Sequence, residues 1–311
     1  MNVDQFIDNI KKDEQGHVVL NLIDNTILHT SYLASALRCS APNFERDPDN
    51  VRYVNGMKNW DGITVFTDKT FHLAPQVNSP VKIAWVVEPY DLLPQIYDLV
   101  AEFEEHYDFI FTYEKTLLDR DSEKYKFFPC DTSGIEIESH ELHKKTKLVS
   151  MIYSEKTWLF GHRLRHIIAK SLIPEMGYKE VDFFGRGTDT PIVLKSEGTN
   201  PYMFQITTEN AKRVNYFTDK IYDCFVAGTV PIYWGAPNID EFFDMRGILS
   251  FNHPSELKNI LLDLNPKKYE MMYEGVVENF KRVKHYLRPD DFLYESIIKH
   301  LKGRGSINGK L

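Results

Sequence analysis

Short apolar runs alternate with helical patterns along most of this chain, and this alternation constrains the fold more than any other feature of the sequence. Four runs, Ile63–Thr67, Lys82–Val87, Phe109–Tyr113 and Tyr125–Phe128, are predicted as short buried strands. Leu93–Phe103 has the apolar spacing of a helix between two of them. Strands separated by helices form parallel sheets that helices cover. The sequence therefore predicts an α/β domain in this region.

A second series of the same kind begins at Leu148. The predicted elements are, in order, a strand from Leu148, a helix near Trp158–Ile173, strands at Val181–Phe184 and Tyr202–Thr207, a helix over Asp219–Ala227 and a strand at Val230–Trp234. Residues 136–147 are nearly all polar and are interpreted as an exposed linker. With 311 residues the chain is long enough for two domains, which we predict at 1–147 and 148–311.

Charge and composition exclude several classes of function. The net charge of −8 argues against a broad nucleic-acid surface. No run of about 18 apolar residues exists, so no transmembrane segment is expected. The first residues have no secretory apolar core. The three widely spaced cysteines, Cys39, Cys130 and Cys224, are interpreted as reduced buried thiols, which together with the missing secretory segment predicts a cytoplasmic protein.

The start of the helix predicted at Asp219–Ala227 suggests a site for an anion. Thr218 is a good N-cap, so Asp219 and Lys220 fall in the first turn. A lysine there opposes the helix dipole unless an anion lies nearby, and helix N-termini bind phosphates. An exposed lysine on a solvated turn explains the pattern equally well, and the helix alone does not decide between the two.

The surrounding residues resemble a known signature. Glu209-Asn210, then Asn215–Ile221 (NYFTDKI), then Ala227–Pro237 (AGTVPIYWGAP) are similar in order and spacing to the motif of the α-1,3/4-fucosyltransferases of glycosyltransferase family 10. Lys147–Ser154, Arg165 and Val181–Gly187 resemble the family segment that precedes this motif. Lys82–Glu88 (KIAWVVE) is a weaker match to the strand that ends in the family's catalytic base.

The resemblance implies a fold and a reaction. The fold class would be α/β, with two facing Rossmann-like domains of the GT-B type and C-terminal helices that can cross back to the first domain. The first domain would bind the glycan acceptor, and the second would bind the nucleotide sugar. The reaction would transfer fucose from GDP-fucose to a hydroxyl of the acceptor with inversion. No general acid would be needed, because a nucleoside diphosphate is already a weak base. No cofactor and no obligatory metal would be needed either, because Arg165, Lys220 and a helix N-terminus would replace a divalent ion at the diphosphate.

The resemblance also assigns roles to single residues. Glu88 would be the base, and it follows a predicted strand at the sheet edge where α/β proteins place ligands. Arg165 and Lys220 would clamp the diphosphate, for which the planar fork of arginine is suited. Tyr216 and Asp219 would hold the diphosphate, ribose or sugar hydroxyls.

Two further pairs belong to the predicted donor site. Glu209 and Asn210 follow a strand and would fix the donor loop, although capping or a turn is the usual role of asparagine. Gly185 and Arg186 end another strand and would let the backbone approach the donor, although a plain tight turn explains them nearly as well. Without the resemblance, Glu88 and Arg165 would be interpreted as solvated surface charges.

Three positions depart from the family pattern: Asp219 replaces a glutamate, Glu155 an asparagine, and Asn215 an aspartate or glycine. GDP-mannose or a UDP-hexose therefore remains open as the donor, and so does a carbohydrate-binding protein without turnover. Asp119-Arg120-Asp121 has the Asp-x-Asp form of metal-dependent glycosyltransferases but lies in a charged stretch that favours a solvated turn. His140 and His143 have no third ligand nearby, so no metal is expected at either place.

Overall fold

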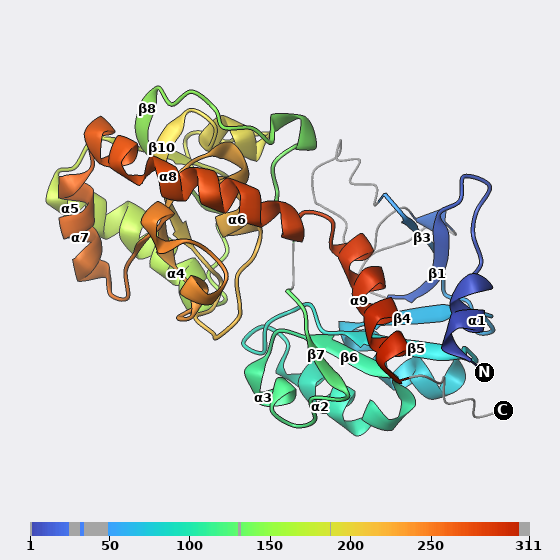
Figure 1. Cartoon of the computed structure of the whole chain (residues 1–311). Coiled ribbons are helices and arrows are strands. Elements are labelled where there is room, and N and C mark those ends of the chain that lie inside the picture. Colours follow the sequence, from blue (N-terminus) through green and yellow to red (C-terminus); the bar gives the residue numbers. More distant parts are fainter. Residues whose placement is uncertain (1, 25–31, 34–48, 130–131, 187, 305–311) are drawn as a thin grey trace. The chain divides into compact units, whose positions relative to one another are not determined.

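The computed structural model describes residues 2–24, 32–33, 49–129, 132–186 and 188–304 (Figure 1). The chain divides into two compact units. Among the described residues, the first unit takes in those up to 129 and those from 288 to 304, and the second takes in 132 to 287. The structure therefore divides the chain near 131 and again at 288, and not at the predicted boundary of 147. Cys39 and Cys130 lie outside the described residues.

The first unit is built on a seven-stranded sheet with the order β2-β3-β1-β4-β5-β6-β7. The strands are β1 (Val18–Ile23), β2 (Tyr32–Leu33), β3 (Val51–Asn55), β4 (Ile63–Thr67), β5 (Val81–Trp85), β6 (Phe109–Thr112) and β7 (Tyr125–Phe127). All neighbours pair in parallel except β2 and β3, which are antiparallel. The four strands predicted from apolar runs are present, whereas β1, β2 and β3 were not predicted from the sequence.

Helical segments cover both faces of this sheet. They are α1 (Val3–Asp8), η1 (Asp68–Gln76), α2 (Pro94–Glu102), η2 (Glu104–His106), α3 (Lys115–Leu118) and α9 (Pro289–Arg304). Phe6 of α1 and Leu293, Ile297 and Leu301 of α9 pack in one core with residues of β1, β3, β4 and β5. A second core contains Phe71 of η1 and Ile96 of α2. The sheet is therefore buried on both faces, as a parallel sheet requires.

The second unit is built on a five-stranded parallel sheet with the order β12-β11-β10-β8-β9. The strands are β8 (Lys147–Ile152), β9 (Val181–Phe184), β10 (Tyr202–Thr208), β11 (Val230–Trp234) and β12 (Leu249–Ser250). The helical segments are η3 (Ile137–Ser139), α4 (Phe160–Ile167), a π-helical turn (Ile168–Leu172), α5 (Ile173–Met176), η5 (Lys195–Gly198), α6 (Asp219–Ala227), η6 (Ile239–Glu241), η7 (Met245–Gly247), α7 (Pro254–Asp263), α8 (Pro266–Val283) and η8 (Lys284–Tyr286).

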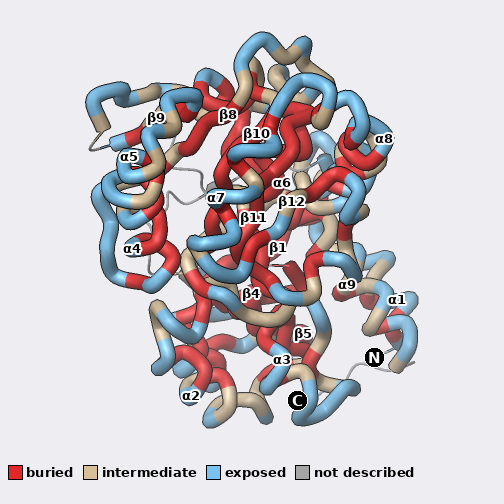
Figure 2. Tube along the Cα trace, turned by 90° about the vertical axis from the view of Figure 1, so that its left-hand side faces the viewer, coloured by how far each residue is buried: buried red, intermediate tan, exposed pale blue. Residues whose placement is uncertain are grey.

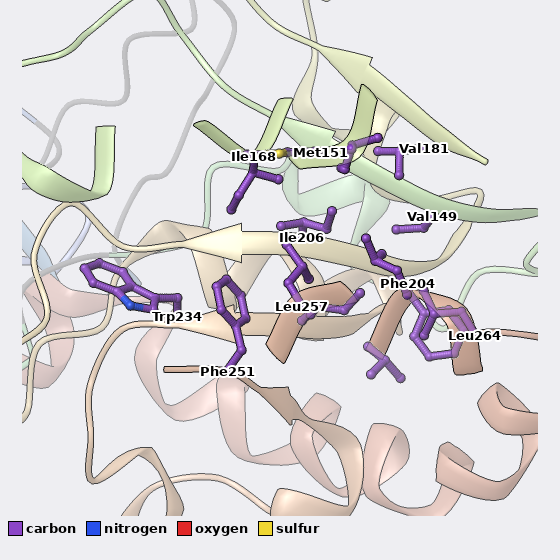
Figure 3. Packing of buried hydrophobic residues seen from close by; sticks show 14 of the residues in the cluster. Val149, Met151, Ile168, Val181, Phe204, Ile206, Trp234, Phe251, Leu257 and Leu264 are labelled. Carbon is purple, nitrogen blue, oxygen red and sulfur yellow. The ribbon is translucent and has the colours of Figure 1, made fainter. Parts of the chain in front are cut away.

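Two apolar cores hold this sheet between its helices. In one of them, shown in Figure 3, Phe204 and Ile206 of β10 pack with Leu257 of α7 and Ile168 of the π turn. The other contains Ile221 and Phe225 of α6. In Figure 2 the central strands β10 and β11 are mostly red, and the outer turns of the helices are pale blue. The two parallel-sheet α/β domains predicted from the sequence are confirmed.

The predicted exposed linker at 136–147 is wrong, because these residues belong to the second unit. Lys145 Nζ donates to the carbonyl oxygens of Asn200 and Ala227 at 2.9 and 2.6 Å, and to Thr229 Oγ1 at 2.8 Å. Burial lowers the pKa of Lys145 to about 7. Lys145 thus attaches the polar segment to the last residue of α6 and to the loop before β10. In the part of the chain that the structure describes, no helix is long and apolar enough to cross a membrane.

Candidate donor site

The second sheet changes winding direction between β8 and β10, and this is where α/β folds place ligands. β9 lies on one side of β8, whereas β10 lies on the other, with β11 and β12 following in the same direction. Loops that leave the carboxyl ends of β8 and β10 therefore separate and leave a crevice. Tyr153 and Ser154 follow β8, Gly185 and Arg186 follow β9, and Asn210 closely follows β10. All of these residues line one cavity.

The cavity has a volume of about 520 Å³ and carries an excess of positive charge. Five cations line it: Lys156, Arg165, Arg186, Lys195 and Lys220. Of the carboxylates that the structure describes, those of Asp219 and Asp223 line it. Burial lowers the pKa of His162, which also lines it, to about 4, and neighbouring Arg165 adds to this effect. His162 is then neutral near pH 7, and the cavity is suited to a ligand with several negative charges.

Arg165 is fixed on α4 by the end of β10. Its side chain is buried, with 7% exposed. Nε donates to Thr208 Oγ1 at 2.8 Å, and Nη2 donates to the Thr208 carbonyl oxygen and, at 3.0 Å, to Asn210 Oδ1. Among the described residues, Nη1 makes no hydrogen bond. The guanidinium is therefore held in one orientation with donor capacity left for a ligand.

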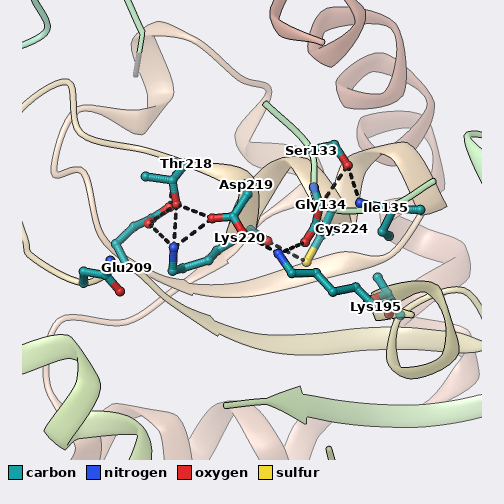
Figure 4. Close-up of polar contacts among 12 residues, drawn as sticks. Ser133, Gly134, Ile135, Lys195, Glu209, Thr218, Asp219, Lys220 and Cys224 are labelled. Atoms are coloured by element: carbon teal, nitrogen blue, oxygen red, sulfur yellow. Dashed lines mark hydrogen bonds and ion pairs between the residues drawn. The ribbon is translucent and has the colours of Figure 1, made fainter. Parts of the chain in front are cut away.

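Lys220 lies among protein oxygens at the start of α6, as Figure 4 shows. Nζ is 2.8 Å from both Thr218 Oγ1 and Asp219 Oδ1, and 3.8 Å from Glu209 Oε2. Burial by itself would lower the pKa of Lys220, but Asp219 and Glu209 outweigh it and raise the pKa. The ammonium therefore stays charged. The carboxylates of Asp219 and Glu209 supply part of the negative charge that a lysine in the first turn of a helix requires.

Glu209 stabilises the start of α6, although it does not line the cavity. It is fully buried, and its carboxylate accepts the amide hydrogen of Thr218 at 2.9 Å and the Thr218 hydroxyl at 2.6 Å. Thr218 occupies the N-cap position but makes no side-chain cap, because its hydroxyl is directed to Glu209. Tyr216 is also buried, with 2% exposed, and neither Tyr216 nor Glu209 belongs to the cavity lining.

A second group of charges, which the sequence analysis missed, adjoins Asp219. Lys195 of η5 forms ion pairs with Asp219 and, at 2.8 Å, with Asp223. The Ser133 hydroxyl and the Gly134 amide donate to Asp223 Oδ1. Burial would raise the pKa of Asp219, but Lys195 and Lys220 outweigh it and hold the pKa well below its usual range. The four-residue spacing of Asp219 and Asp223 on α6 could have revealed Asp223, whereas no pattern marks Lys195.

Gly185 brings two strand ends together. Its φ of 118° lies in a region that side chains rarely adopt, and an added Cβ would stand 2.1 Å from the Tyr153 carbonyl oxygen. Only glycine fits where β9 leaves the sheet beside β8. Arg186 follows as an exposed residue of the cavity lining. Glycine is thus required here for close approach of backbone to backbone.

Glu88 belongs to the first unit and is therefore described separately from the cavity. It follows β5 and is half-buried. Its amide donates to Asp68 Oδ2 at 3.3 Å, and its carbonyl oxygen accepts the Tyr97 hydroxyl at 2.8 Å. The backbone of Glu88 is thus held from two sides at the carboxyl edge of the first sheet.

The two carboxylates of the Asp-x-Asp sequence bind residues close to them in the chain. Asp119 pairs with Lys115 at 2.8 Å on an exposed turn, and Asp121 Oδ1 accepts the amide of Glu123 at 2.8 Å. The ring nitrogen Nε2 of His143 contacts the Ser139 carbonyl oxygen at 2.8 Å. Within the described ranges, no group of three or more histidine, cysteine, aspartate or glutamate side chains could hold a metal ion.

Comparison with known families gives a match over most of the second unit. Residues 142–287 match the family model described as glycosyltransferase family 10 (fucosyltransferase) C-term. An α-(1,3)-fucosyltransferase of Helicobacter pylori is 30% identical over 110 residues, which are 35% of this chain and 20% of that protein. GDP-fucose protein O-fucosyltransferase 3 of Homo sapiens is 30% identical over 120 residues, which are 33% of this chain and 25% of that protein. This chain thus spans a quarter or less of these relatives.

Solved structures show the same fold. A crystal structure of an α1,3-fucosyltransferase with GDP-fucose superposes with a TM-score of 0.52 at 13% identity and covers 96% of both chains. The structure of “Trehalose-6-phosphate from E. coli bound with UDP-2-fluoro glucose” superposes with a TM-score of 0.54 at 9% identity, over 90% of this chain and 99% of that one. The GT-B type of two Rossmann-like domains, expected from the sequence, is confirmed.

Proposed function

We propose that this chain, in which residues 142–287 match the C-terminal model of glycosyltransferase family 10, is an enzyme that transfers fucose from GDP-fucose to a hydroxyl of a glycan acceptor. The observation that carries the proposal is the positive cavity where the second sheet changes winding direction, because its described lining contains five cations and two carboxylates. Such a cavity suits a nucleoside diphosphate, and the family match directs the choice to fucose. The proposed location is the cytoplasm.

In the proposed reaction, two cations hold the leaving diphosphate. Arg165 presents its remaining Nη1 hydrogens to the phosphate oxygens, and Lys220 adds a charge beside the N-terminus of α6. As the bond between the anomeric carbon and the diphosphate oxygen breaks, the electron pair goes to GDP. Cations placed where this charge develops stabilise the transition state. They take the place of a divalent metal, so the proposed enzyme needs none.

Glu88 is the proposed base. Its carboxylate takes the proton of the acceptor hydroxyl while the oxygen of that hydroxyl forms the new bond to the anomeric carbon. Attack opposite the leaving GDP in a single displacement inverts the configuration at that carbon. One carboxylate is enough, because GDP leaves without being protonated.

A panel of nucleotide sugars tests the donor. A ligand at about 100 times its dissociation constant stabilises the folded protein by about 2.7 kcal/mol. GDP-fucose should therefore raise the melting temperature more than GDP-mannose or any UDP-hexose does. A larger increase with a UDP-hexose would contradict the fucose assignment and leave the transferase proposal intact. A protein that binds sugars without turnover would release no GDP from any donor.

Substituting the proposed base tests the mechanism. Glu88→Gln keeps the shape of the side chain but takes up no proton, so turnover should fall by roughly 10²–10⁴. The affinity for GDP, measured by calorimetry, should stay unchanged. Glu102→Gln, at an exposed position of α2, is the matched control and should leave both quantities unchanged. Wild-type turnover in Glu88→Gln would show that the base lies elsewhere.

A further inference from the structure

Asp68 occupies an unusual backbone position directly after β4. Its φ is 37°, and among the described residues other than glycine only Asn215 shares a positive φ. This region favours glycine and is tolerated by asparagine and aspartate. Asp68 is also buried, with 4% exposed. A residue that is both strained and buried needs an explanation in what its side chain contacts.

The Asp68 carboxylate binds the loop that carries Glu88. β4 and β5 are parallel neighbours, and Thr67 at the end of β4 pairs with Trp85 at the end of β5. The segments that follow the two strands therefore leave the sheet at the same edge. Oδ1 of Asp68 accepts the Val87 amide at 2.8 Å, and Oδ2 accepts the Glu88 amide at 3.3 Å. Together with the Tyr97 hydroxyl on the Glu88 carbonyl oxygen, this fixes the peptide units on both sides of Glu88.

A simple turn role does not account for this arrangement. Glycine would satisfy the backbone at less cost, and asparagine would satisfy it without burying a titratable group. Burial, together with the nearby charge of Glu88, instead raises the pKa of Asp68 to about 7. The carboxylate is retained although its burial is unfavourable, and its two oxygens are both used on the backbone at 87–88.

We propose that Asp68 is a positioning residue for Glu88, which it holds at the sheet edge through the two amides. The inference rests on the proposed role of Glu88 as the base. A base must reach the hydroxyl to within hydrogen-bonding distance, and small displacements reduce the rate strongly. Loosening the 87–88 backbone therefore lowers kcat. It leaves donor binding unchanged, because the cavity is lined by residues of the second unit.

The test compares Asp68→Asn and Asp68→Gly with Asp108→Asn. Asp108 accepts the amide of Lys82 at 2.8 Å, near the opposite end of β5, which makes it a matched control. Release of GDP from GDP-fucose in water serves as the reaction, since it needs no glycan acceptor. We expect kcat to fall by about 10- to 100-fold in Asp68→Asn and further in Asp68→Gly, with KM and the GDP dissociation constant unchanged. Asp108→Asn should keep the wild-type kcat.

Amide hydrogen exchange gives a second readout that needs no activity. The amides of Val87 and Glu88 should lose protection in both Asp68 variants and keep it in Asp108→Asn. Unchanged protection would overturn the proposal. The proposal would also be overturned if kcat fell in proportion to the loss of melting temperature, and to the same extent in the Asp68 and Asp108 variants. Impaired Glu88→Gln with normal Asp68 variants would refute Asp68 alone. Normal turnover in Glu88→Gln would refute the base assignment and, with it, this proposal.

Discussion

The Thr218 hydroxyl donates a 2.6 Å hydrogen bond to the buried Oε2 of Glu209, nine residues earlier in the chain. The start of α6 is therefore tied to the end of β10, and Lys220 in the first turn lies 3.8 Å from the same Oε2. Protein oxygens of Thr218, Asp219 and Glu209 thus hold the Lys220 side chain without a ligand. Its direction toward the cavity is set by the fold, so binding a diphosphate requires little ordering of this side chain.

Removing this cation should weaken GDP binding. A hydrogen bond to a charged group is worth about 1.5–3 kcal/mol, so Lys220→Ala should raise the GDP dissociation constant roughly 10- to 150-fold. Turnover should fall as well, because the diphosphate carries charge both before and during the reaction. Lys268→Ala, which removes a partly exposed pair with Asp263, is the control in calorimetry. Equal GDP affinity in the two variants would contradict the proposed role of Lys220.

Transfer should survive removal of divalent metals. Arg165, Lys220 and the α6 N-terminus supply the positive charge at the proposed diphosphate site. Initial rates measured with and without EDTA should agree, and Asp119→Asn and Asp121→Asn should retain wild-type activity. If chelation abolishes turnover and Mn²⁺ restores it, the Asp-x-Asp carboxylates become candidate ligands.

Asp68 should make stability depend on pH in a definite direction. Its folded pKa of about 7 lies above an unfolded value of about 3.9, so the folded state binds the proton more tightly. The resulting stabilisation is complete below pH ~4 and is lost as the pH rises through ~7. The unfolding free energy of the wild type relative to Asp68→Asn should decrease over this range by roughly 4 kcal/mol at most. Denaturant titrations at several pH values measure it, and a constant difference would contradict the shift.

Gly185→Ala should cost more than Gly177→Ala. Both glycines have positive φ, but an alanine Cβ at 177 would meet open space, whereas at 185 it would stand 2.1 Å from the Tyr153 carbonyl oxygen. Gly177→Ala should lose about 1–2 kcal/mol of stability from backbone strain alone. Gly185→Ala should lose more and should also weaken GDP binding, as followed by thermal denaturation and calorimetry. Equal losses of stability in the two variants would show that the ends of β8 and β9 move apart to make room for the Cβ at 185.

The second unit was the more predictable from sequence because its signals are local. Val181–Phe184, Asp219–Ala227 and Val230–Trp234 form elements with the predicted bounds, since apolar runs there end at glycines. β1 was missed because its buried Asn21 interrupts the apolar run. Asn21 Nδ2 donates to the Met57 carbonyl oxygen at 2.8 Å and to Thr64 Oγ1 at 3.2 Å, partners that no local pattern reveals.

The candidate site was predictable where a motif existed and not where tertiary contacts formed it. Arg165, Asn210 and Lys220 converge on one cavity, which is what the motif resemblance implied. Lys195 and Asp68 could not be identified, because a single charged residue outside a recognisable motif is usually solvated. Lys145 shows the same limit, since its burial depends on carbonyl oxygens at Asn200 and Ala227, far along the chain.

The contribution of α9 to the first unit bears on how this protein acquires its structure during synthesis. Leu293, Ile297 and Leu301 complete a core whose other members lie between Val3 and Phe128, and Asp290 accepts the Tyr53 hydroxyl at 3.0 Å. A ribosome makes these helix residues only after the whole second unit. The second unit can therefore fold first. Until α9 has been made, the strands of the first unit keep one apolar face uncovered. Chaperone binding to the nascent chain should accordingly concentrate on the half that is translated first.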